Sequence, residues 1–245
     1  MNTNRQTAVM KESKMKITTS KLIRWAGLAA MLAGSFYVAI GFFHPVKSLS
    51  TVTTTEWAVI HSLAFAMSFF GLLGITGIYA RQVEEAGWLG LAGYILLSLW
   101  LVLLAPFTFA EVFILPPLAT EAPAFVESFL GVFTGHAHPG GVDLGAMKTI
   151  WDLDGFVYIL GGLLFGIATL RAGILSRWPA GLLVAAALVT PAGALLPHEH
   201  MALVAVPVGL ALAWLGYTLW SERSEKATQP VPTRVSPQLS QSAGR

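Results

Sequence analysis

The residues of this sequence best suited to chemistry are its six histidines and thirteen acidic residues, because the chain has no cysteine. The lack of cysteine excludes disulfides, thiolate metal sites, iron–sulfur clusters and a cysteine nucleophile. Neutral imidazole and carboxylate remain, and together they are a ligand set for zinc, manganese or iron. The most informative of these residues are His61 and Glu111, since each lies in or at the end of a long apolar run.

We predict a binding pocket made by His61, Glu111, Asp152 and Asp154. His61 lies four positions after Trp57 in an apolar run, and an ionisable group inside a membrane helix usually faces a partner or a cavity. The two aspartates begin a short apolar segment, which could bring them to the same depth as His61 and Glu111. Each residue also has a simpler interpretation: a hydrogen-bonded neutral imidazole, a boundary with water at Glu111, and helix N-capping by the aspartates.

A divalent metal ion is a further candidate ligand. His198 and His200 flank Glu199 in a tight turn between two apolar runs, and a His-x-His sequence can bind metal. The predicted ligands are His61, His198 and His200. The alternative is that the histidines of this turn are only solvated, as we also expect for His136 and His138 in a glycine-rich loop.

The composition indicates which elements position these residues. Hydrophobic residues make up 55% of the 245-residue chain and charged residues only 11%, whereas soluble domains carry roughly 25% charged residues. A helix needs about 20 apolar residues to cross the hydrocarbon core, and a single spanning segment must be helical. The fold class we predict is therefore an all-α integral membrane protein with a bundle of six transmembrane helices. The predicted spans are 22–43, 57–80, 87–110, 152–171, 178–197 and 201–220.

Lysine and arginine predict the orientation of this bundle. With the N-terminus in the cytoplasm, both basic terminal segments lie inside and only Lys47 and Lys148 lie outside. Such a distribution follows the positive-inside rule. We therefore expect a multi-pass protein of the cell inner membrane with cytoplasmic N- and C-termini. All six histidines then fall in the outer half.

The segments outside the spans differ in character. Residues 1–21 form a basic cytoplasmic tail, and residues 221–245, rich in serine, glutamine and proline, predict a disordered cytoplasmic tail. The long outer loop, 111–151, contains apolar residues at helical spacing from Phe125 to Phe133. These predict a short amphipathic helix on the outer side.

The expected partner of the chain is the lipid bilayer. A net charge of only +2 gives no reason to expect a nucleic acid. Gly162 with Gly166, and Gly209 with Ala213, are small-residue pairs that allow helices to approach closely. We expect them to pack within the chain, with a homo-oligomer as the alternative.

Two sequences within residues 53–118 carry a resemblance. They are Gly-Ile-Tyr-Ala-Arg-Gln and Glu-Ala-Gly-Trp-Leu-Gly-Leu-Ala-Gly. The region resembles small hydrophobic multi-pass membrane proteins of bacteria whose families are uncharacterised. The resemblance implies a bacterial inner membrane, but it implies no activity and assigns no functional residue.

Three functions follow from these patterns. The first is a binding or transport-related membrane protein with a His/carboxylate pocket in the outer leaflet, which is not an enzyme. The second is an intramembrane metal-dependent hydrolase that acts on a lipid, and the third is a structural or interaction protein without a small-molecule site. Haem or quinone chemistry is disfavoured because only His61 lies clearly inside a predicted span.

Overall fold

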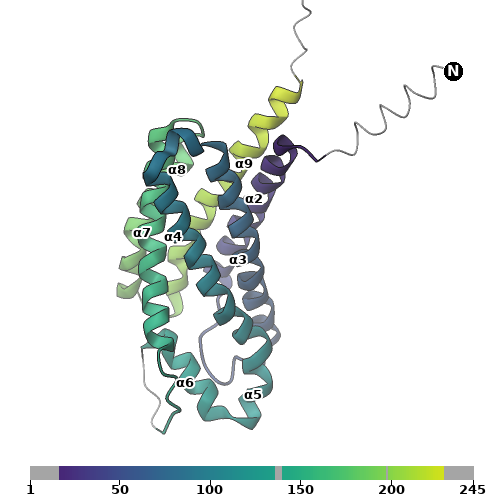
Figure 1. Ribbon diagram of the computed structural model, residues 1–245. Helices are drawn as coiled ribbons and strands as arrows, with labels where there is room; N and C mark the ends of the chain where they lie inside the picture. The colour runs from purple at the N-terminus through teal and green to yellow at the C-terminus, as the bar shows by residue number, and fades with distance from the viewer. Residues whose placement is uncertain (1–16, 136–139, 197, 229–245) are drawn as a thin grey trace, which may run out of the picture.

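The computed structural model describes residues 17–135, 140–196 and 198–228, and the regular structure of these residues is entirely helical. The chain runs up and down through a bundle of long helices (Figure 1). Helix α2 begins at Thr19 and α9 ends at Thr228, both at the same end of the bundle. At the opposite end, two short helices and the connecting loops close the bundle. Residues 1–16 and 229–245, which make up most of the two predicted tails, lie outside the described residues.

The first three passes are α2 (Thr19–Phe43), α3 (Thr55–Arg81) and α4 (Val83–Phe109). Threonine side chains cap the first two: the hydroxyl of Thr18 accepts from the backbone N–H of Lys21, and that of Thr54 accepts from Trp57. Such caps satisfy backbone donors that lack an intrahelical partner. The two helices thus begin a few residues before the predicted spans, which start at residues 22 and 57.

After α4 the chain stays helical, where the sequence predicts a loop from residue 111. A π-helical turn, η1 (Ala110–Ile114), leads into α5 (Leu115–Glu121), and α6 (Pro123–Thr134) follows. The paired prolines Pro116 and Pro117 closely follow the π-helical turn, so they remove two backbone N–H donors from a helical segment that continues from α4. The predicted short helix corresponds to α6, and its apolar face is buried through residues Val126, Phe129 and Leu130.

The second half contains α7 (Met147–Ala172), α8 (Arg177–Val189) and α9 (Ala205–Thr228). Two 3-10 helices, η2 (Thr190–Leu195) and η3 (His198–Val204), separate α8 from α9. The predicted fifth span at 178–197 is therefore α-helical over only its first part. Pro191 explains this difference, because proline lacks the backbone N–H and clashes with the preceding helical turn.

Five helical segments in the described residues are long and apolar enough to cross a membrane. The α8 segment is shorter than this, so the predicted count of six does not follow from helix length. The five segments are Thr19–Phe43, Thr55–Arg81, Val83–Glu121, Met147–Ala172 and His200–Ser221.

Small residues let the long helices pack closely within the chain. A Cβ placed on Gly74 of α3 would lie 2.6 Å from the Cα of Ala30 in α2, and one on Gly209 would lie 2.7 Å from the carbonyl oxygen of Gly34. Gly166, from the predicted small-residue pairs, meets Val184 of α8 in the same way. In a membrane the hydrophobic effect does not bring helices together, because lipid tails are as apolar as the helix surfaces. Close packing of the helix backbones stabilises the bundle instead.

The buried apolar residues form two clusters. The larger cluster fills the bundle, and its centre includes Met67, Phe165 and Leu215. The smaller one gathers around Trp57, Phe107 and α6 at the end of the bundle away from the described ends of the chain. The region between the two clusters contains the candidate site.

Candidate functional site

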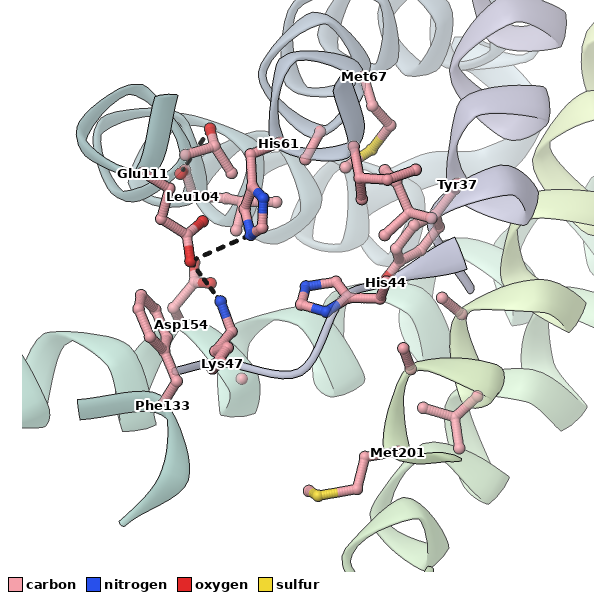
Figure 2. A pocket seen from close by; sticks show the side chains of 18 of the residues that line it. Tyr37, His44, Lys47, His61, Met67, Leu104, Glu111, Phe133, Asp154 and Met201 are labelled. Carbon is pink, nitrogen blue, oxygen red and sulfur yellow. Dashed lines mark hydrogen bonds and ion pairs between the residues drawn. The ribbon is translucent and has the colours of Figure 1, made fainter. Parts of the chain in front are cut away.

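A cavity of about 360 Å³ opens between α2, α3, α4, α7 and η3, and Ala205, the first residue of α9, also lines it. Its wall is mostly apolar and aromatic, with a small set of polar side chains (Figure 2). Volume and lining are typical of sites for small organic molecules. The polar and titratable lining residues are Tyr37, His44, Lys47, His61, Thr108, Glu111, Asp154 and Tyr158.

Glu111 lies in the π-helical turn and is only 3% exposed. Its carboxylate forms an ion pair with the ammonium of Lys47, and its backbone carbonyl accepts from the indole Nε1 of Trp57 at 2.7 Å. A π-helical turn adds one residue to the helix, and such turns are frequent at functional sites. Glu111 therefore does not mark a boundary with water, which was its simpler interpretation.

Lys47 comes from the loop between α2 and α3, and its side chain is 14% exposed. Its ammonium lies 4.0 Å from the centroid of the Phe133 ring and 5.5 Å from that of Trp57. Aromatic faces attract cations, and the attraction grows when water is excluded. The ion pair thus lies in an aromatic corner where both charges are largely removed from water.

His61 is 1% exposed and stacks on Trp57 with 3.9 Å between the ring centroids. Its Nδ1 donates to the carbonyl of Trp57 at 2.9 Å, which fixes a proton on that nitrogen. Its Nε2 lies 3.5 Å from Oε1 of Glu111 and has no hydrogen-bond partner among the described residues. A lone pair on Nε2 would repel the carboxylate, whereas a proton on it would attract. This contact is therefore sensitive to any proton or hydrogen-bond donor that enters the cavity.

His44 follows α2 and brings a second imidazole to the cavity, with its ring centroid 5.2 Å from that of His61. Its Nδ1 donates to the carbonyl of Pro45 at 2.8 Å. Burial lowers the pKa of His44 from 6.5 to about 3, and the nearby Lys47 and His61 add to this effect. Glu111 and the bond to Pro45 act in the opposite direction without reversing it. His44 is therefore neutral at pH 7.

This depressed pKa predicts a pH-dependent stability. Below pH 6.5 the unfolded chain binds a proton at His44, whereas the folded chain does not until about pH 3. Stability therefore falls as the pH drops through this window, by about 2 kcal/mol at pH 5 from this residue. We expect His44→Gln to lose less stability than the unmodified protein between pH 7 and pH 5, measured by thermal unfolding in detergent.

The matched control is His200→Gln, because the side chain of His200 is exposed. This variant should keep the pH dependence of the unmodified protein. If the stability of the unmodified protein and that of His44→Gln depend equally on pH, the pH dependence does not come from His44.

The two aspartates of the predicted pocket lie in different environments. Asp154 lines the cavity, is 2% exposed, and its Oδ1 has no hydrogen-bond partner in the described part of the chain. Asp152 is exposed and pairs with Lys148 at 2.6 and 2.7 Å. The structure thus brings His61, Glu111 and Asp154 to one cavity and leaves Asp152 on the surface.

The predicted metal ligands do not form a site among the described residues. No group of three or more His, Asp or Glu side chains that could hold a metal occurs there. His61 lines the cavity, whereas His200 is exposed and does not. The side chain of His198, and the residues His136 and His138, lie outside the described residues.

Sequence reasoning missed five polar residues of the cavity, which are Tyr37, His44, Lys47, Thr108 and Tyr158. One signal pointed to Lys47, which is one of two basic residues on the predicted outer side. Tyr158 gave none, because a single tyrosine in an apolar helix is common.

Comparison of the chain with protein-family models, with curated proteins and with solved structures finds no match. The functional argument therefore rests on the cavity itself.

Proposed function

We propose that this chain is a multi-pass membrane protein that binds a small, largely apolar molecule in the cavity. One observation carries the proposal: a cavity with apolar and aromatic walls also contains a buried carboxylate oxygen, on Asp154, that has no hydrogen-bond partner among the described residues. A buried polar group without a hydrogen bond is costly. The unpartnered oxygen of Asp154 costs the folded protein little stability if a bound ligand donates the missing hydrogen bond.

Six passes through the membrane are part of this proposal, with α8 and η2 together making the fifth. The 13 residues of α8 rise about 20 Å at the α-helical spacing, and the 6 residues of η2 add about 12 Å at the 3-10 spacing. Their sum is close to the ~30 Å hydrocarbon core. The common end of α2 and α9 supports an even number of passes (Figure 1). With cytoplasmic termini, as the basic residues favour, the cavity faces the outer side.

The absence of cysteine allows a direct test of this topology. Ser50, between α2 and α3, and Glu85, at the start of α4, are exposed at opposite ends of the bundle. In intact cells of a bacterial host, we expect a membrane-impermeant maleimide to label Ser50→Cys. Glu85→Cys should react only after the cells are permeabilised. The reverse pattern, or labelling of both in intact cells, would contradict the proposed orientation.

The other two functions receive less support. A metal-dependent hydrolase needs about three ligands and an open position, and the described residues hold no such group. A purely structural protein would not need a cavity that contains two buried carboxylates. It remains as one outcome of the binding experiment.

The binding experiment uses 3-phenylpropan-1-ol and the protein in nanodiscs of phosphatidylcholine. We expect saturable binding, detected by ligand-observed NMR. Ala64 of α3 lines the cavity, so Ala64→Phe should remove the saturable component by filling it. The matched control is Ala58→Phe on the same helix, because Ala58 is exposed.

If both variants bind like the unmodified protein, the molecule does not bind in this cavity. If neither 3-phenylpropan-1-ol nor the corresponding amine, 3-phenylpropylamine, binds saturably, the proposed function is wrong and the structural alternative is favoured.

A further inference from the structure

The charges that line the cavity do not balance. Two carboxylates, of Glu111 and Asp154, and one ammonium, of Lys47, lie on its wall. Lys47 pairs with Glu111 and packs against the face of Phe133. It forms no ion pair with Asp154 in the part of the chain that the structure describes. Asp154 is thus the carboxylate that lacks a counter-charge.

The histidines of the cavity do not supply this charge. His61 directs its Nε2 at Glu111, 3.5 Å away. His44 is neutral at pH 7 and uses its Nδ1 proton for the carbonyl of Pro45. Neither forms an ion pair or hydrogen bond with Asp154 among the described residues.

A second unpartnered group lies one helical turn from Asp154. The hydroxyl of Tyr158 is buried and lies near the side chains of Tyr37 and Thr190, without a hydrogen bond of normal geometry to any described residue. Residues four apart lie on the same face of a helix, and both line the cavity. Oδ1 of Asp154 accepts hydrogen bonds and the tyrosine hydroxyl also accepts. Together they offer acceptors for a group with several N–H donors.

Aromatic rings lie beside these acceptors. The ring of Trp100 lies 4.6 Å from that of Tyr158 and 6.0 Å from that of Tyr37, measured between centroids. All three residues line the cavity. Their faces can hold an apolar body and also attract a cation.

We propose, on the basis of the binding function above, that the ligand is a small apolar amine bound as its ammonium ion. Its nitrogen donates to Oδ1 of Asp154 and to the hydroxyl of Tyr158, and its apolar body packs against Trp100 and Tyr37. An anionic ligand is disfavoured, because it would bring a second negative charge to an unpaired buried carboxylate. A neutral alcohol fits the shape but leaves the charge of Asp154 without compensation.

The test compares 3-phenylpropylamine with 3-phenylpropan-1-ol in the same uncharged phosphatidylcholine nanodiscs. The two molecules differ in the ammonium group, which is charged near neutral pH. Hydrogen bonds to a charged group are stronger than those between neutral groups, so we expect the amine to bind at least about 10-fold more tightly. This comparison uses the unmodified protein and needs no variant to fold.

The variant Asp154→Asn tests whether the ammonium group of the ligand binds at Asp154. The substitution keeps the side-chain volume and replaces a buried carboxyl group that pairs with no other described residue, so the variant should fold. We expect it to weaken amine binding about 10-fold or more and to change alcohol binding less than about 3-fold. Asp152→Asn is the matched control on the same helix, since Asp152 is exposed and pairs with Lys148. It should leave both affinities unchanged.

The outcomes separate this inference from the proposed function. If the alcohol binds in the cavity and the amine binds no more tightly, the amine proposal is wrong and the binding function stands. An amine preference that persists in Asp154→Asn also overturns it, because the charge is then recognised elsewhere. If neither molecule binds saturably, both proposals fail together.

Discussion

Glu111→Gln should lower the free energy of unfolding by about 3–5 kcal/mol, the usual cost of removing one partner from a buried ion pair. The glutamine keeps the shape of the side chain but leaves the ammonium of Lys47 without its counter-charge. Lys47 is only 14% exposed on its side chain and lies over the ring of Phe133, so water does not readily replace the carboxylate. Thermal unfolding in detergent should show a clearly lower midpoint for this variant.

The double variant Lys47→Met/Glu111→Gln separates the cost of an unpaired charge from the contribution of the pair. We expect it to recover most of the lost stability, since replacing a whole buried pair is often close to neutral. Asp152→Asn is the exposed control and should change stability by less than about 1 kcal/mol. A loss below about 1 kcal/mol for Glu111→Gln would mean that Lys47 reaches water, which contradicts the buried pair.

Gly74→Leu should destabilise the bundle by about 3 kcal/mol or more, because it forces apart two helices whose backbones are in contact. A Cβ at this position would lie 2.6 Å from the Cα and 2.8 Å from the backbone N of Ala30. Backbone atoms cannot move aside as the end of a flexible side chain can. The expected result is a lower unfolding midpoint and a reduced yield of monodisperse protein in detergent.

Gly181→Leu on α8 is the matched control for this prediction. A Cβ on Gly181 would meet only the end of the Leu170 side chain, at 4.0 Å. We expect a change within about 1 kcal/mol, including the gain from replacing a helical glycine. Similar losses in both variants would mean that leucine is poorly tolerated in this bundle in general. The close contact between α2 and α3 would then not be the cause.

The α-helical class and most of the helix positions could be predicted from the sequence. Long apolar runs without charged residues leave few alternatives to helices. The five segments long and apolar enough to cross a membrane overlap five of the six predicted spans, although Val83–Glu121 runs past the predicted end at residue 110. The fifth predicted span differs because hydropathy does not register the effect of Pro191 on backbone hydrogen bonds, which ends α8 at Val189.

The candidate site was only partly predictable, and the two aspartates show why. An α-helix turns about 100° per residue, so Asp152 and Asp154 project about 200° apart and only one of them can face the cavity. Which one does so depends on the rotation of α7 in the bundle. That rotation is set by packing against α4 and α8 rather than by the composition of α7.

The pairing of Glu111 with Lys47 also depends on the tertiary structure. The two residues are separated by 64 positions in the sequence, and one lies in a loop without periodicity. The sequence by itself determined an apolar helical chain and singled out His61, Glu111 and Asp154 as ionisable residues in or beside its apolar runs. Only the folded bundle decided which charges are paired and that Oδ1 of Asp154 has no partner among the described residues, because pairing depends on distances between side chains from different helices.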